Sequence, residues 1–122
     1  MTETRESMEH FLTLNSPWFE YVRDGIKTYE GRSCKNGKVK KYKIGDIITI
    51  SHHTDFNQKE YQVKILDILF YPDFRFALEI LGLEKTLPGT KTIDEGETIY
   101  FKYVSKETQF EYGVCMINVQ RI

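Results

Sequence analysis

The run from Ile47 to His52 constrains the fold of this chain more than any other segment. It reads Ile-Ile-Thr-Ile-Ser-His, so its first four residues are all β-branched. Such a run is typical of a β-strand that is buried on both sides. A second long strand is predicted over residues 61–71, where Tyr61, Val63 and Ile65 alternate with polar residues and therefore share one face.

Shorter patterns predict the remaining elements. Residues 10–14 and 114–119 alternate as strands do. Helices are predicted over 73–81, from apolar spacings of three and four, and from Thr92 onward, where Thr92-x-x-Glu95 has the form of a capping box. About six strands and about three short helices predict an α+β fold in which helices pack around a small β-barrel. An OB-like barrel and an open sheet are the alternatives that composition leaves open.

Length and composition predict one folded domain. The chain has 122 residues, of which 40% are hydrophobic and 14% aromatic, enough for a single core. Residues 1–8 are polar and are expected to be a flexible N-terminus, with the domain over 9–122. The net charge of -1 argues against general attraction to nucleic acid or membranes, so any nucleic-acid site must be local.

The cysteines and the hydropathy pattern indicate a compartment. Cys34 and Cys115 are few and far apart in the sequence, which suits reduced thiols better than a disulfide framework. No apolar run is long enough for a membrane helix, and the charged start lacks the apolar region of a signal peptide. We therefore expect a cytoplasmic protein without a membrane partner. The oligomeric state stays open.

A helix followed by a glycine break and a strand is predicted over residues 16–32. Ser16 is expected to cap the helix and Pro17 to occupy its first position, and Gly25 permits the left-handed residue that ends it. Asn36-Gly37 then fits a tight hairpin turn, so the strand after Gly25 is expected to pair with residues 39–42.

Three charged residues open this strand. Lys27 and Arg32 can donate to a phosphate or a base carbonyl, while Glu30 can accept from an amine or act as a base on a ribose 2′-hydroxyl. On a regular strand Lys27 points away from the other two, so the three converge only if Lys27 lies in the turn before the strand. The alternative is a Glu30–Arg32 ion pair that orders the barrel mouth, with Lys27 solvated.

Neighbouring residues extend this candidate site. Trp18 is either a stacking platform or a core residue, and Ser16 either a helix cap or a ligand contact. Lys38, Lys40 and Lys41 lie in the most basic stretch and either follow a phosphate backbone or protect a solvated hairpin edge.

No metal or cofactor is expected. His52 and His53 are adjacent, so on a strand they face opposite ways and make a poor metal pair. The two cysteines are too far apart in the sequence for a metal-ligand spacing.

These residues resemble a known family, the ASCH domain of the PUA-like superfamily. The resemblance rests on Trp18, on the motif Gly25-x-Lys27-x-x-Glu30-x-Arg32 and on Gly45-Asp46 before an apolar strand. It covers roughly residues 9–121. It implies a PUA-like β-barrel whose motif, with Lys27, Glu30 and Arg32, lines a cleft that binds RNA or a modified nucleoside or nucleotide. With Ser16 and Trp18 from the residue-level interpretation, these make up the expected ligand contacts.

The same resemblance implies enzymatic alternatives. Some members resemble amidohydrolases that depend on a threonine three residues after the lysine, and others have been proposed to cut single-stranded RNA. Here Glu30 stands three residues after Lys27 and Thr28 is displaced, which argues against the amidohydrolase reaction. The second hypothesis is therefore a hydrolase acting on RNA or a modified nucleoside, with Glu30 as base and Lys27 as electrostatic stabiliser. The third is a protein-interaction module that uses exposed aromatics such as Phe74, Tyr100 or Phe110.

Overall fold

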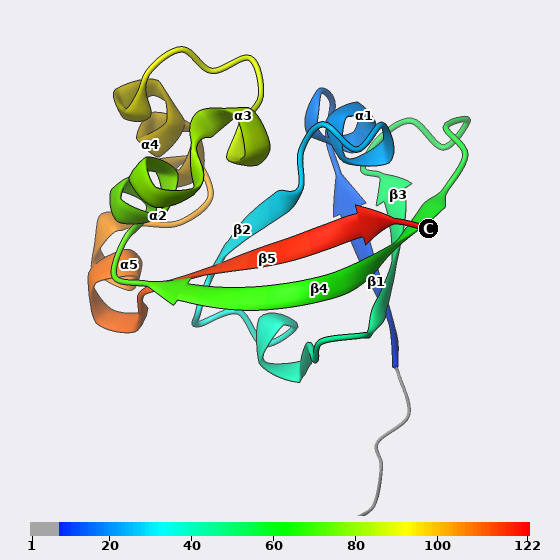
Figure 1. Cartoon of the computed structure of the whole chain (residues 1–122), viewed down its shortest axis with the longest axis horizontal. Helices are drawn as coiled ribbons and strands as arrows, with labels where there is room; N and C mark the ends of the chain where they lie inside the picture. Colours follow the sequence, from blue (N-terminus) through cyan, green and yellow to red (C-terminus); the bar gives the residue numbers. More distant parts are fainter. Residues whose placement is uncertain (1–7) are drawn as a thin grey trace, which may run out of the picture.

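A strongly curled five-stranded sheet forms the centre of the molecule (Figure 1). The structure is a computed structural model that describes residues 8–122. The strands are β1 (Glu9–Leu14), β2 (Tyr29–Ser33), β3 (Ile47–His52), β4 (Tyr61–Tyr71) and β5 (Val114–Arg121). Their spatial order is β1-β3-β4-β5-β2, with β1 parallel to β3 and the other pairs antiparallel.

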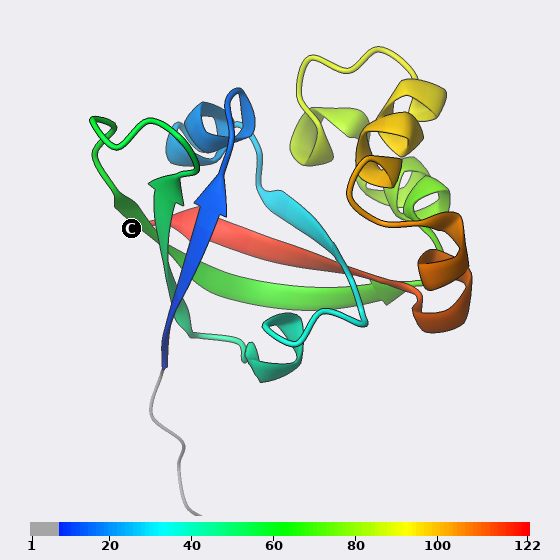
Figure 2. The ribbon, with the colours of Figure 1, turned by 180° about the vertical axis from the view of Figure 1, so that it is seen from behind.

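Helices cover two parts of this sheet (Figures 1 and 2). They are α1 (Trp18–Arg23), the 3₁₀ helix η1 (Val39–Lys41), α2 (Phe74–Leu81), α3 (Leu83–Thr86), α4 (Ile93–Phe101) and α5 (Lys106–Tyr112). Helices α2 to α5 lie between β4 and β5 in the chain and gather on one side of the molecule. Helix α1 lies apart from them, near the carboxyl ends of β1 and β3.

Most predicted elements are confirmed, but their number is not. Five predicted strands, the one after Gly25 included, and the helices over 73–81 and after Thr92 are present. The Thr92 side chain accepts a hydrogen bond from the Glu95 amide at 3.1 Å. Over residues 8–122 there are five strands and five α-helices rather than about six and three. Helix α3 is a single turn, and α5 buries none of its residues, so neither shows an apolar period.

The predicted hairpin after Asn36 is wrong. Strand β2 pairs with β5, and residues 39–41 form the 3₁₀ helix η1 instead of a strand. Val39 and Tyr42 are both buried in the core, and residues three apart point the same way on a helical turn but opposite ways on a strand. Burial of this pair therefore selects the helical turn.

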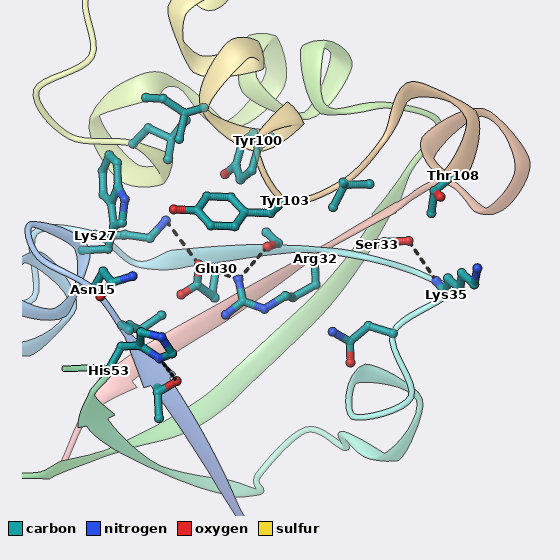
Figure 3. Close-up of a pocket in the computed structure, with 18 of the residues that line it drawn as sticks. Asn15, Lys27, Glu30, Arg32, Ser33, Lys35, His53, Tyr100, Tyr103 and Thr108 are labelled. Carbon is teal, nitrogen blue, oxygen red and sulfur yellow. Dashed lines mark hydrogen bonds and ion pairs between the residues drawn. The ribbon is translucent and has the colours of Figure 1, made fainter.

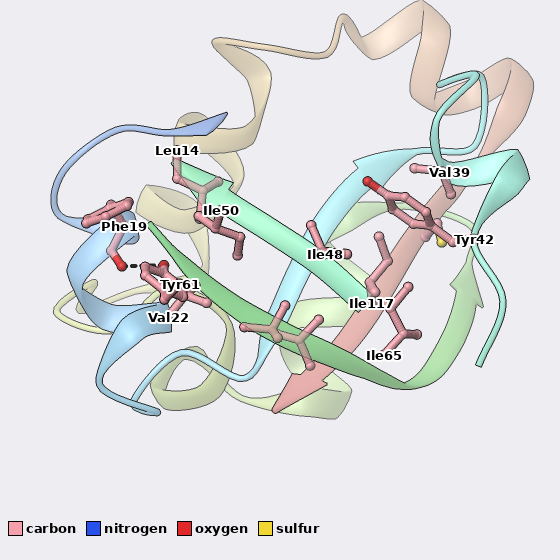
Figure 4. Packing of buried hydrophobic residues seen from close by; sticks show 13 residues of the cluster. Leu14, Phe19, Val22, Val39, Tyr42, Ile48, Ile50, Tyr61, Ile65 and Ile117 are labelled. Atoms are coloured by element: carbon pink, nitrogen blue, oxygen red, sulfur yellow. Dashed lines mark hydrogen bonds between the residues drawn. The ribbon is translucent and has the colours of Figure 1, made fainter. Parts of the chain in front are cut away.

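Two apolar clusters lie on opposite faces of the sheet. The barrel core lies inside the curl of the sheet, and the helix-side core lies between the sheet and α2 to α4 (Figure 4 shows the barrel core). The barrel core includes Leu14, Phe19, Val22, Val39, Tyr42, Ile48, Ile50, Tyr61, Val63, Ile65, Cys115, Ile117 and Val119. The helix-side core includes Phe74, Ala77, Leu78, Leu87, Tyr100, Val114 and Met116. Alternate residues of β5 thus serve the two cores.

An irregularity in β4 lets this strand serve both cores as well. The register with β5 shifts between Ile65 and Asp67, so one extra residue changes the alternation. As a result Ile65 and Ile68 both contact the barrel core, whereas Leu69 and Tyr71 contact the helix-side core.

The described chain begins with residues that are tied to β3. The predicted flexible segment 1–8 lies outside the described residues except for Met8. The Met8 amide donates to Asp46 Oδ1 at 3.1 Å, and its carbonyl accepts from the Ile47 amide at 3.0 Å. Cys34 and Cys115 are free thiols. None of the helices within residues 8–122 has both the length and the apolar character that crossing a membrane requires.

Candidate functional site

A cavity of about 610 Å³ opens between the end of β1, strand β2 and helix α4 (Figure 3). Its lining combines charged side chains with aromatic ones. The charged and imidazole groups are Lys27, Glu30, Arg32, Lys35 and His53, and the aromatic rings are Trp18, Tyr100 and Tyr103. This mixture of an aromatic wall and a few convergent polar groups is typical of a small-molecule site.

Lys27 reaches the cavity from the turn that precedes β2. Gly25 has a φ of 76°, and the amides of Ile26 and Lys27 both donate to the Tyr21 carbonyl, which ends helix α1. The side chain is only 2% exposed, and its Nζ donates to the carbonyls of Tyr29, at 2.6 Å, and Thr86. Burial lowers the Lys27 pKa to about 8, although nearby Glu30 opposes this shift.

Glu30 and Arg32 lie side by side on β2. Arg32 Nη1 is 3.1 Å from Glu30 Oε1 and donates to the Gly31 carbonyl at 2.9 Å. Lys27 Nζ is 3.8 Å from the same Glu30 oxygen. The three side chains therefore meet, as expected for Lys27 in the turn before the strand. The Glu30–Arg32 ion pair of the alternative is also present, but a solvated Lys27 is wrong.

The second carboxylate oxygen of Glu30, Oε2, has no hydrogen-bond partner among the described residues. Glu30 is 9% exposed, and this oxygen is buried. A carboxylate oxygen only accepts hydrogen bonds, and a buried polar atom without a partner is unusual in a native protein. The site therefore lacks a hydrogen-bond donor for Glu30 Oε2.

Trp18 borders the cavity and also packs in the core, so the predicted core role is confirmed in part and the stacking role stays a prediction. The ring lines the cavity and also packs, partly buried, against the helix-side core. Lys27 Nζ lies 5.7 Å from the centre of the ring, within the range of a cation–π contact.

Ser16 is placed differently from the prediction. Its hydroxyl donates to Glu20 Oε1 and contacts His52 Nε2 at 2.9 Å. In the described part of the chain no side chain caps α1, so the predicted Ser16 cap is wrong. Ser16 is also absent from the lining of the cavity, as far as residues 8–122 show, because Glu20 and His52 occupy its hydroxyl. Asn15 lines the cavity in its place.

The three lysines predicted to follow a phosphate backbone lie outside the cavity lining. Lys38, Lys40 and Lys41 are exposed on or beside η1, and Lys38 Nζ donates to the Phe11 carbonyl at 3.2 Å. Their placement follows from the helical turn that replaces the hairpin. Lys35 is instead the basic residue that borders the cavity.

Tyr100 is the main residue that the sequence interpretation missed. The ring stacks on Phe74 with centres 4.0 Å apart and planes 10° apart, and it crosses directly over Gly31. A Cβ on Gly31 would lie 2.8 Å from Tyr100 Cε1, so only glycine leaves room for the ring. Tyr100 was named as a candidate exposed aromatic, because nothing in the local sequence indicates that its helix meets β2.

His52 and His53 face opposite ways, as predicted. His52 is buried, and its Nδ1 accepts from the amides of Thr54 and Asp55. His53 is exposed at the cavity, where its Nδ1 lies 3.2 Å from Thr13 Oγ1. Among the described residues, no three His, Cys, Asp or Glu side chains form a group that could hold a metal ion.

The curled sheet and its surrounding helices define a PUA-like α+β barrel, and comparisons with solved structures agree. The hypothetical protein PH0355 is 31% identical, with a TM-score of 0.80 over 94% of this chain and 99% of that chain. PF0455 from Pyrococcus furiosus is also 31% identical, with a TM-score of 0.78 over 94% and 98%. This chain belongs to the family of these two proteins. The sequence matches no protein-family model and no curated protein.

A more distant likeness relates the fold to ASCH proteins. A variant of ZmASCH from Zymomonas mobilis is 12% identical, with a TM-score of 0.64 over 92% of this chain and 67% of that chain. At this identity the likeness establishes the shared fold.

Proposed function

We propose that this chain is an ASCH-domain protein that binds a nucleobase in the cavity beside β2, carried by single-stranded RNA or by a nucleoside or nucleotide. The observation that carries the proposal is the buried Glu30 Oε2, which lacks a donor among the described residues and lies beside the Arg32 guanidinium. A base edge offers both partners, an N–H for the carboxylate and an acceptor for the guanidinium.

The size and lining of the cavity support the same ligand class. A volume of about 610 Å³ falls within the range of small-molecule sites, roughly 300–1,000 Å³. Trp18 and Tyr103 both line the cavity, and Tyr103 is largely exposed there. Stacking on such rings contributes about 1–3 kcal/mol per base.

The charge balance separates this site from a general nucleic-acid surface. The chain carries a net charge of -1, and Lys27 uses its ammonium group to hold two backbone carbonyls. Affinity should therefore depend on stacking and on the base edge more than on neutralised phosphates. A shallow dependence of affinity on salt is the expected signature.

An arginine substitution tests the proposal. Arg32→Ala should weaken binding of the preferred ligand about tenfold, because it removes a charge-assisted donor from the cavity. Fluorescence anisotropy with short single-stranded RNA and calorimetry with the ribonucleosides measure this change. Arg75→Ala is the matched control, since Arg75 pairs with Asp94 and Glu97 away from the cavity. Equal affinity of the Arg32→Ala variant and the parent would remove this cavity from consideration.

A hydrolase acting on RNA or a modified nucleoside is the second candidate. Two observations support it: Glu30 Oε2 has no hydrogen-bond partner among the described residues, and the Lys27 ammonium lies 3.8 Å from the other oxygen of the same carboxylate. Glu30→Gln should then abolish turnover while binding persists. Turnover that survives this substitution would rule out Glu30 as the base.

Two of the three aromatic residues named for the protein-interaction alternative are not available on the surface. Phe74 and Tyr100 are buried, and Phe110 alone of the three is exposed, at 93%. The motif lines an open cavity instead of a dry core. We further propose a cytoplasmic location, which the two free thiols support.

A further inference from the structure

A second buried polar atom shares the cavity with Glu30 Oε2. Within the described chain, Tyr100 Oη is the other buried side-chain atom without a hydrogen-bond partner. Tyr100 is 6% exposed and belongs to α4, whereas Glu30 belongs to β2, so the two atoms come from different layers of the fold. Figure 3 shows both side chains directed into the space between these elements.

Packing holds the Tyr100 hydroxyl in this place. Phe74 stacks on one face of the ring, and Tyr100 Oη lies 2.9 Å from the position that a Cβ on Gly31 would occupy. The ring is therefore wedged between α2 and the backbone of β2. Burial, and next the nearby Glu30 carboxylate, raises the Tyr100 pKa well above its ordinary value, so the hydroxyl keeps its proton at neutral pH.

The two atoms need hydrogen-bond partners of opposite kinds. Glu30 Oε2 can only accept a hydrogen bond, while the Tyr100 hydroxyl can donate one. Inorganic phosphate could accept from Tyr100, but its negative charge would face the Glu30 carboxylate. A flat group with an N–H beside a carbonyl or ring-nitrogen acceptor satisfies both atoms.

We propose that Tyr100 Oη and Glu30 Oε2 together read the hydrogen-bonding edge of the ligand base, which enters edge first and leaves its phosphate outside near Lys35. This inference rests on the function proposed above and adds Tyr100 as a specificity-determining residue. It explains why two polar groups stay buried without partners in the free protein, since the ligand supplies both.

The first test compares two buried tyrosines. Tyr100→Phe should weaken binding of the tightest ribonucleoside about tenfold and leave the melting temperature equal or higher, because the lost hydroxyl has no partner in the free protein. Tyr61→Phe is the matched control, since Tyr61 Oη donates to the Phe19 carbonyl at 2.6 Å in the barrel core. That variant should melt at a lower temperature and bind the ribonucleoside normally.

The second test blocks the ligand edge. A derivative methylated on that edge, such as 3-methyluridine or 1-methylguanosine, should bind at least tenfold more weakly than the parent nucleoside. The 5′-monophosphate should gain the same factor of affinity in the wild-type protein and in the Tyr100→Phe variant, because the phosphate and the hydroxyl act at separate places.

The outcomes separate this inference from the proposed function. Binding by the wild-type protein with equal affinity in the Tyr100→Phe variant would overturn the role of Tyr100 and leave the function standing. Equal binding of the edge-methylated derivative would overturn the reading of the edge. If the wild-type protein binds neither the ribonucleosides nor short RNA, the proposed function fails and this inference fails with it.

Discussion

The inside of the barrel and the cavity beside it treat buried polar groups in opposite ways. In the barrel, Tyr61 Oη donates to a backbone carbonyl, and the buried Asp46 carboxylate accepts from the amides of Met8 and Lys43 and contacts His10. Beside the cavity, Glu30 Oε2 and Tyr100 Oη have no partner within residues 8–122. Satisfied polar groups stabilise a fold, while unsatisfied ones cost stability until a ligand pairs with them. The polar groups of the barrel therefore stabilise the fold, whereas those at the cavity are the ones to which we propose that a ligand binds.

The largest effect should come from removing a satisfied charge in the barrel. Asp46→Ala should lower the free energy of unfolding by about 3–5 kcal/mol, because three donors within residues 8–122 lose their acceptor. Urea denaturation measures the loss. Asp24→Ala is the control, because it removes only an exposed partner of Arg23. This variant should change the free energy of unfolding by less than about 0.5 kcal/mol. A loss below about 1 kcal/mol for Asp46→Ala would contradict the assignment of the barrel to stability.

A cavity-side substitution should change stability and binding together. Gly31→Ala should cost about 1–3 kcal/mol of unfolding free energy, because the new methyl group lies 2.8 Å from the Tyr100 ring. The displaced ring should also weaken ligand binding about tenfold. Gly37→Ala is the control, because no heavy atom of the described chain lies within 4 Å of the added Cβ. An unchanged affinity in Gly31→Ala would show that the position of the ring does not matter.

The buried lysine predicts a pH effect of intermediate size. The folded-state pKa of Lys27 is lowered to about 8 from 10.5, so between these values the unfolded chain binds more protons and stability rises with pH. Burial raises the Cys115 pKa to about 12 from 9.0, which lowers stability above pH 9. The Lys27 effect is therefore unopposed between pH 8 and 9. Over this range it should raise the free energy of unfolding by about 1 kcal/mol.

Urea titrations across this window compare the wild-type protein with a Lys27→Met variant, which should lack the rise. A Lys85→Met variant is the control. Because Lys85 is exposed, this variant should keep the rise in stability between pH 8 and 9. Parallel pH profiles for the wild-type protein and Lys27→Met would show that the buried ammonium is not the source.

The smallest effect concerns the lysines outside the cavity. Replacing Lys38, Lys40 and Lys41 with alanine should leave nucleoside affinity unchanged, since none of them lines the cavity in the described chain. If the ligand is single-stranded RNA, its affinity should fall about threefold and the salt dependence should become shallower. Equal RNA affinity before and after the substitution would show that these lysines do not contact the RNA.

Sequence reasoning reached those parts of the candidate site that depend on local structure. Gly25 indicated the break that places Lys27 before the strand, and the structure confirms that Lys27, Glu30 and Arg32 meet. The predictions of a Ser16 helix cap and of a hairpin at Asn36 were wrong. His52, 36 residues away, contacts the Ser16 hydroxyl, and β5, from the far end of the chain, pairs with β2.

By itself the sequence determined the five strands that form, the capped helix at Thr92 and the glycine-bounded turn, because these follow from patterns within a few residues. Only the tertiary structure decided that β2 pairs with β5 and that Tyr100 lies over Gly31. Those choices depend on the packing of segments about 70 to 90 residues apart in the chain, which no local pattern records. The cavity exists because these distant segments meet. Of the two unpaired polar atoms found within residues 8–122, one comes from β2 and the other from α4.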